Sequence, residues 1–110
     1  MANVFKNSIK GPINTTGTVV YTTPASTATT VIGINVANIV DENIYVDVQL
    51  TDNSESITKY LVKNSLIPEG SSAVLVGGEQ KIVLESGDSI TIVSSIDNAA
   101  DTVVSVLEIS

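Results

Sequence analysis

IYVDVQLT, residues 44–51, alternates apolar and polar side chains along its whole length. In an extended chain, Ile44, Val46, Val48 and Leu50 lie on one face and the intervening residues lie on the other. This alternation is typical of a β-strand that has one buried face and one face in water. It predicts a sheet whose apolar side is covered by a second layer of the protein.

Similar short runs follow one another from Thr18 onward, separated by clusters of Gly, Pro, Asp, Asn and Ser. Val and Ile make up 29 of the 110 residues, and their branched side chains favour strands over helices. The spacing of the runs is typical of a sandwich or jelly roll. We therefore expect an all-β, antiparallel β-sandwich or jelly roll of about eight strands, formed by residues 17–110. The expected strands are residues 18–22, 29–40, 44–51, 57–63, 73–76, 81–85, 89–95 and 102–109.

Residues 1–16 show no sustained helical or strand periodicity, which predicts an extended N-terminal arm. The arm carries four apolar side chains, and apolar arms bury such residues on their own domain or on a neighbouring subunit. These candidate assembly residues are Val4, Phe5, Ile9 and Ile13. Two expected strands are also apolar on both faces, so either the arm or another subunit covers the second face. Self-association or docking on a larger assembly is the favoured interpretation.

The chain contains no His, Cys, Arg or Trp, and 12 acidic residues against 5 lysines give a net charge of −7. Without His or Cys, a Ser-His or Cys-His catalytic pair cannot form, and the usual zinc ligands are missing. Without Arg, the acidic chain is poorly suited to phosphate or nucleic acid. No apolar run approaches a membrane span, and no signal peptide is recognisable. We expect no enzyme activity, cofactor or metal, and no nucleic-acid or membrane partner.

Acidic turns offer the strongest alternative chemistry. The turn Asp52-Asn53-Ser54-Glu55 and the segment 97–101 supply oxygen ligands that suit calcium, but neither has the spacing of an EF-hand loop. Asx-turn formation between strands is the preferred interpretation. The pairs Asp41-Glu42 and Asp97 with Asp101 lack the aromatic-lined cleft of a glycosidase. Lys59 and Lys63 fit a solvated strand face better than a Ser-Lys site.

Four segments at the turns and ends of the expected strands are similar to those of a known class of protein. The segments are VYTTP at 20–24, LIPEG at 66–70, LESGD at 84–88 and VVSVLEI at 103–109. From about Thr18 to the C-terminus, the chain resembles small β-sandwich virion structural proteins of tailed bacteriophages, of the capsid decoration or tail and neck accessory type. The resemblance implies a non-enzymatic homo-oligomer that attaches in many copies to a major capsid or tail protein. It also implies localisation to a virion that is assembled in the host cytoplasm.

The expected function is therefore that of a capsid decoration or cement protein on the head. A tail or neck accessory protein is the alternative within the same class. A carbohydrate- or receptor-binding β-module is the alternative from another class, with Tyr21, Tyr45 or Tyr60 stacking on the ligand. The small number of aromatic residues argues against that alternative, because sugar sites usually present exposed rings.

Overall fold

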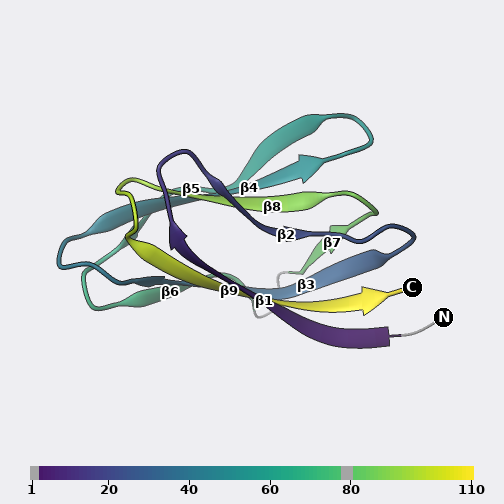
Figure 1. Cartoon of the computed structure of the whole chain (residues 1–110), viewed down its shortest axis with the longest axis horizontal. Coiled ribbons are helices and arrows are strands. Elements are labelled where there is room, and N and C mark those ends of the chain that lie inside the picture. The colour runs from purple at the N-terminus through teal and green to yellow at the C-terminus, as the bar shows by residue number, and fades with distance from the viewer. Residues whose placement is uncertain (1–2, 78–80) are drawn as a thin grey trace.

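The structure is a computed structural model that describes residues 3–77 and 81–110. These residues form strands joined by turns and loops, and Figure 1 shows the strands in two layers. The strands are β1 (Asn3–Ile13), β2 (Thr18–Thr22), β3 (Ala28–Asn38), β4 (Ile44–Asp52), β5 (Ile57–Ile67), β6 (Ser72–Val76), β7 (Ile82–Leu84), β8 (Ser89–Ser94) and β9 (Ala100–Ile109).

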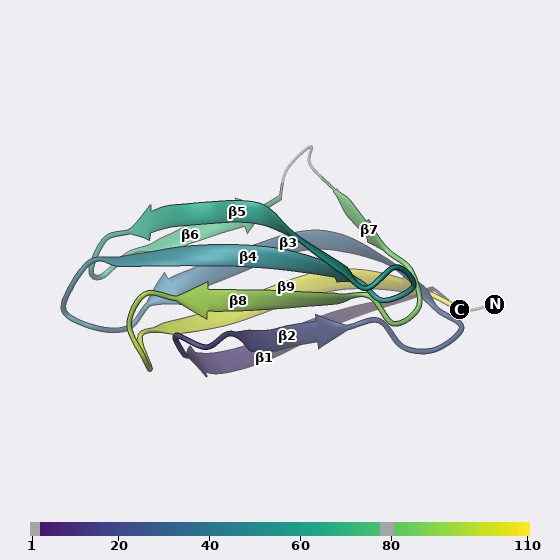
Figure 2. The same cartoon turned by 90° about the horizontal axis from the view of Figure 1, so that it is seen from above.

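Two antiparallel sheets pack face to face, as the turned view in Figure 2 also shows. Sheet A has the order β1, β9, β3, β6, with β7 also paired to β3, and sheet B has the order β2, β8, β4, β5. β6 and β7 pair with different parts of β3, so together they occupy one strand position. Each sheet then has four positions in the order of a jelly roll, which confirms the predicted fold class.

The core lies between the two sheets and consists almost entirely of Val, Ile and Leu. In β4, Ile44, Val46 and Val48 are fully buried while Tyr45 is exposed, as the alternation predicted. Each such side chain stabilises the fold by about 1.5–3 kcal/mol through burial. The other large, fully buried side chains include Ile13, Val20, Val31, Ile34, Val36, Ile67, Leu84, Ile90, Ile92, Val104 and Val106.

The predicted N-terminal arm is extended, but the structure does not leave it outside the sheets. Residues 3–13 form β1, which pairs with β9 from Asn3 opposite Ile109 to Ile13 opposite Ala100. The segment therefore widens sheet A and does not cover its outer face, which corrects that alternative. Sequence periodicity missed β1 because it is an edge strand, where inward positions near water accept Lys6 and Lys10.

No helix that is long and apolar enough to cross a membrane occurs within residues 3–77 and 81–110.

Candidate functional site

The candidate assembly residues divide into one buried and three exposed side chains. Ile13 is fully buried and packs in the core of its own sandwich. Val4, Phe5 and Ile9 have exposed fractions of 41%, 76% and 68%. The exposed three are on β1, so an assembly role remains a prediction for them, while Ile13 has a structural role in this fold.

Strand register places Phe5 and Ile9 in two apolar rows that cross the outside of sheet A. The first row runs from Phe5 through Leu107 and Thr30 to Val83. The second runs from Ile9 through Val103 and Asn35 to Val74. Val74 and Val83 are 70% and 66% exposed, so both ends of each row project into solvent. We call the surface formed by these eight residues the sheet A face.

The sheet A face differs from the outside of sheet B in charge. Asp101, at one end of β9, is the single charged residue among the described strand residues that point outward from sheet A, judged by the register. On sheet B, the Lys63 ammonium lies 3.4 Å from an Asp47 carboxylate oxygen and 4.6 Å from the centre of the Tyr60 ring. A charge-free surface with exposed apolar side chains is suited to contact with another protein.

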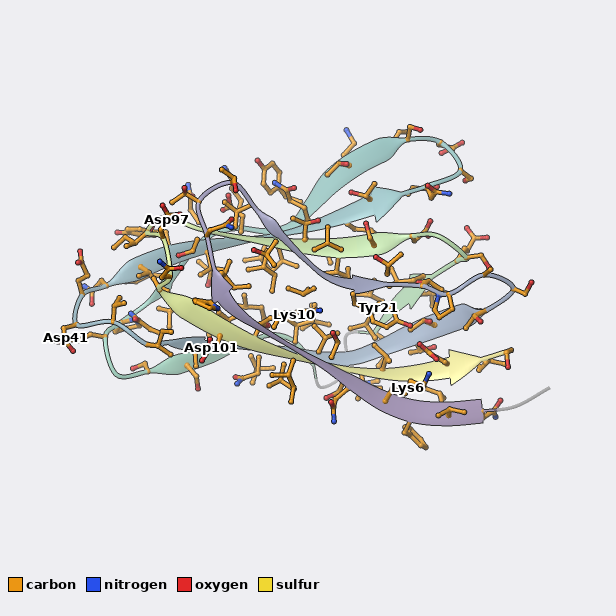
Figure 3. All side chains as sticks on the ribbon, in the orientation of Figure 1. Lys6, Lys10, Tyr21, Asp41, Asp97 and Asp101 are labelled. Atoms are coloured by element: carbon orange, nitrogen blue, oxygen red, sulfur yellow. The ribbon has the colours of Figure 1, made fainter. Side chains whose placement is uncertain are left out.

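A hydrogen-bonded cluster at the end of the sandwich opposite Asp101 joins the two sheets. The Tyr21 hydroxyl of β2 donates to Glu108 Oε2 of β9 at 2.5 Å, and the Lys6 ammonium lies 3.0 Å from Glu108 Oε1. Because the Tyr21 proton is engaged, the Thr29 hydroxyl donates to the Tyr21 oxygen at 2.9 Å. Figure 3 shows Lys6 and Tyr21 near the same end of the molecule, away from Asp41 and Asp97.

The surroundings of this cluster shift the pKa values of both acids. Burial raises the pKa of Tyr21 to about 12, and its hydrogen bond to Glu108 acts in the same direction. The hydrogen bond from Tyr21 lowers the pKa of Glu108, and the bond from Lys6 adds to that effect. The cluster therefore holds a neutral Tyr21 against an ionised Glu108.

Replacing Tyr21 by phenylalanine is expected to lower the free energy of unfolding by about 1.5–3 kcal/mol near neutral pH, because a hydrogen bond to a charged group is lost. The lowered pKa of Glu108 contributes stability above its ordinary pKa, and this contribution disappears as pH falls through its folded value. The difference between wild type and Tyr21→Phe should therefore shrink in acid. Urea unfolding near neutral pH and at about pH 3 measures it.

Tyr45→Phe is the matched control, since Tyr45 is exposed on sheet B. Its unfolding free energy should stay within about 0.5 kcal/mol of wild type at both pH values. An equal loss in the two variants, or a Tyr21→Phe deficit that does not change with pH, would contradict the role given to Glu108.

The structure brings together three acids that sequence reasoning did not connect. Carboxylate oxygens of Asp52, Glu85 and Asp88 lie within 4.8 Å of one another, where the β4–β5 turn meets the β7–β8 turn. Such oxygens are of the kind that calcium prefers. However, the Asp88 carboxylate already accepts the backbone N–H groups of Asn53 and Glu85, each at 3.0 Å. No local pattern signals this meeting, because it depends on strand pairing between distant segments.

The acidic turn at Asp52 has the Asx-turn bonding that the preferred interpretation predicted, whereas Asp97 is bonded to a distant segment. Asp52 Oδ1 accepts the Ser54 N–H at 3.0 Å, the Ser54 hydroxyl at 2.8 Å and the Glu55 N–H at 3.2 Å. These bonds, the Ser54 hydroxyl foremost, lower the pKa of Asp52. Asp97 Oδ1 accepts the Thr15 N–H at 2.8 Å, and this bond lowers the pKa of Asp97. Asp52 therefore stabilises its own turn, whereas Asp97 joins the loop between β8 and β9 to the loop between β1 and β2.

The three tyrosines of the sugar-binding alternative do not form one surface. Tyr21 lies partly buried between the sheets, where its hydroxyl is bonded to Glu108 and Thr29. Tyr45 and Tyr60 are exposed on sheet B, where they pair with Leu66 and Gln49 at different positions along the strands. The described residues thus provide no shared aromatic platform for a ligand.

Comparison with known proteins identifies the fold and no family. No protein-family model and no curated protein matches the sequence. Among solved structures, the chain is similar to a protein of Bacillus endospore appendages, which form disulfide-linked pili, with a TM-score of 0.59 and 14% identity over 98% of this chain and 88% of that one. It is also similar to a protein of the IBDV viral particle, with a TM-score of 0.60 and 9% identity. That match covers 96% of this chain but only 30% of the viral one. The chain thus shares its β-sandwich fold with proteins of a pilus and of an icosahedral virus particle.

Proposed function

We propose that this chain is a non-enzymatic structural protein of a tailed phage, attached in many copies to the head as a decoration or cement protein. The observation that carries the proposal is the sheet A face, a charge-free surface with Phe5, Ile9, Val74 and Val83 projecting into solvent. Monomeric proteins rarely keep large apolar strips uncovered. The likeness in fold to proteins of a virus particle and of a pilus supports the same class.

The turn and strand-end segments resemble those of phage virion proteins. This resemblance supports the assignment to a phage and the major capsid protein as the partner. A tail or neck accessory protein would have the same fold and the same exposed face. The two locations therefore have to be separated by imaging.

Immunogold labelling of purified virions from the phage that encodes the chain tests the proposal. We expect gold particles spread over the head. Label confined to the tail or neck would replace the decoration role with the accessory role. A complete lack of label, with the protein recovered only from the soluble fraction of lysed cells, would overturn the virion assignment.

The assembly role of β1 has its own test in heads assembled without the chain. We expect Phe5→Asp to reduce recovery of the added protein with sedimented heads by at least about tenfold, because a charge buried without a partner is costly. Val19→Asp is the matched control, since Val19 is a 51% exposed valine on sheet B. Equal recovery of the two variants would show that the sheet A face does not take part in attachment to the head.

A further inference from the structure

We infer that the sheet A face is the interface of a symmetric dimer, in which it packs against the same face of a second copy. The inference deepens the proposed function and rests on it for its biological setting. The inference says which molecule covers the two rows of the sheet A face. The strand register of the rows, the area of sheet A and the net charge of the chain support it.

The two rows of the sheet A face are complementary to themselves. A two-fold axis parallel to the strands, passing between β9 and β3, brings the β1 edge of one copy over the β6 and β7 edge of the other. Because each row keeps its position along the axis, Phe5 then meets the partner subunit's Val83, and Ile9 meets the partner subunit's Val74. Large side chains thus face smaller ones across both rims, as close packing of two sheets requires.

The centre of the face suits the same axis. β9 and β3 are the inner strands of sheet A, and Leu107 of one copy would lie over Thr30 of the other. In the same way, Asn35 of one copy would lie over Val103 of the other.

The outer surface of sheet A is also large enough for a dimer interface. β1 and β3 each have 11 residues, which span about 36 Å at about 3.3 Å per residue. Four strand positions spaced about 4.8 Å apart give a width of about 19 Å. The whole outer surface of sheet A, including the row of Asn7, Ser105 and Gly33 between the two rows of the sheet A face, therefore has a footprint of about 700 Å² per copy, close to the about 800 Å² that each partner buries in a standard specific interface. A face of this size is sufficient for a stable dimer.

The distribution of charge favours a second copy as the partner of the sheet A face. Each copy carries a net charge of −7, so two copies repel each other except where they meet through an uncharged surface. The sheet A face is such a surface, with Asp101 at its rim. A basic capsid protein would instead be attracted to acidic groups, and these lie elsewhere, on Asp47 of sheet B and on Asp52, Glu85 and Asp88 at the turns.

The net charge of each copy also determines how association depends on salt. Salt screens the repulsion between two acidic copies, so dimerisation through the sheet A face should strengthen as salt increases. Attraction between this chain and a basic partner should weaken under the same change. The sign of the salt effect thus distinguishes a second copy from a basic protein as the molecule that covers the face.

Sedimentation velocity and light scattering on the purified chain, at low and high salt, test the inference. We expect a dimer whose population rises with salt. Leu107→Asp should weaken dimerisation by on the order of 100-fold while circular dichroism and the melting temperature report a folded sandwich. Phe5→Asp provides a second variant at the edge of the sheet if Leu107→Asp does not fold. Val19→Asp on sheet B should dimerise like wild type.

Disulfide cross-linking tests the axis, and the absence of native cysteine makes the result unambiguous. The double variant Ile9→Cys with Val74→Cys should oxidise to a covalent dimer, whereas Ile9→Cys alone should not. Efficient cross-linking of Ile9→Cys alone would place the axis across the strands and overturn the proposed arrangement.

A wild-type chain that stays monomeric at every salt concentration would overturn the dimer. If that monomer still labels phage heads, the proposed function stands and only this inference fails. If the protein forms the predicted cross-linked dimer but is missing from virions, the dimer stands and the proposed function fails. Dimerisation lost in Val19→Asp but retained in Leu107→Asp and Phe5→Asp would also contradict the inference.

Discussion

Truncating Ile92 to alanine is expected to lower the free energy of unfolding by about 2–5 kcal/mol, the range for a large aliphatic side chain removed from a core. Ile92 is fully buried in β8, where its neighbours in register are Thr18 of β2 and Val48 of β4. Hydrogen-bonded strands on both sides prevent β8 from moving to fill the cavity. The loss is large beside the about 5–15 kcal/mol that stabilises a typical domain.

Urea unfolding followed by circular dichroism measures this loss as a lower midpoint with an unchanged slope. Val19→Ala is the matched control, because Val19 pairs with Thr91 next to Ile92 but points outward from sheet B. Its effect should stay within about 0.5 kcal/mol. Similar losses in the two variants would show that the space between the sheets is not the main core.

Replacing Asn38 by alanine is expected to cost about 2–4 kcal/mol, because three backbone groups lose their partner. The buried Asn38 amide donates to the carbonyl oxygens of Glu42 at 2.7 Å and Ile67 at 3.0 Å. Its side-chain oxygen accepts the Val40 N–H at 2.9 Å. The side chain therefore holds the crossing from β3 in sheet A to β4 in sheet B and ties it to the end of β5.

Thermal and urea unfolding of Asn38→Ala should show the loss, and Asn43→Ala serves as the control. Asn43 is exposed in the same loop, where its side chain accepts a single bond, from the Glu69 N–H at 3.2 Å. We expect Asn43→Ala to change the unfolding free energy by about 0.5 kcal/mol or less. A mild Asn38→Ala variant would mean that water or a loop shift satisfies the three groups.

Sequence pattern predicted the strands well where burial alternates. The expected 18–22 and 44–51 match β2 and β4, apart from one residue at the end of β4. The expected strand 29–40 ends earlier, at Asn38, where the Asn38 side chain accepts the N–H of Val40. The strand expected at 57–63 continues to Ile67 past Asn64, which has a φ of 54° and an N–H bound to Asp47 at 2.7 Å. The bond between Asn64 and Asp47 joins residues 17 apart, a separation that a local pattern does not contain.

The site was predictable in part. The apolar character of Phe5 and Ile9 drew attention to the N-terminal segment, and both are exposed in the fold. Their alignment with Val74 and Val83 was not predictable, because it depends on the order of strands in sheet A. That order joins segments from both ends of the sequence, and composition carries no information about it.

The pairing of β1 with β9 also has a consequence for synthesis. β9 contacts both β1 and β3, so sheet A has a gap between these two strands until β9 has been made. Pairings between such distant segments form slowly, in milliseconds to seconds, and unpaired strand edges promote aggregation meanwhile. We therefore expect the pairing of β9 with β1 and β3 to be a late step of folding, before which the edges of β1 and β3 are open to other chains.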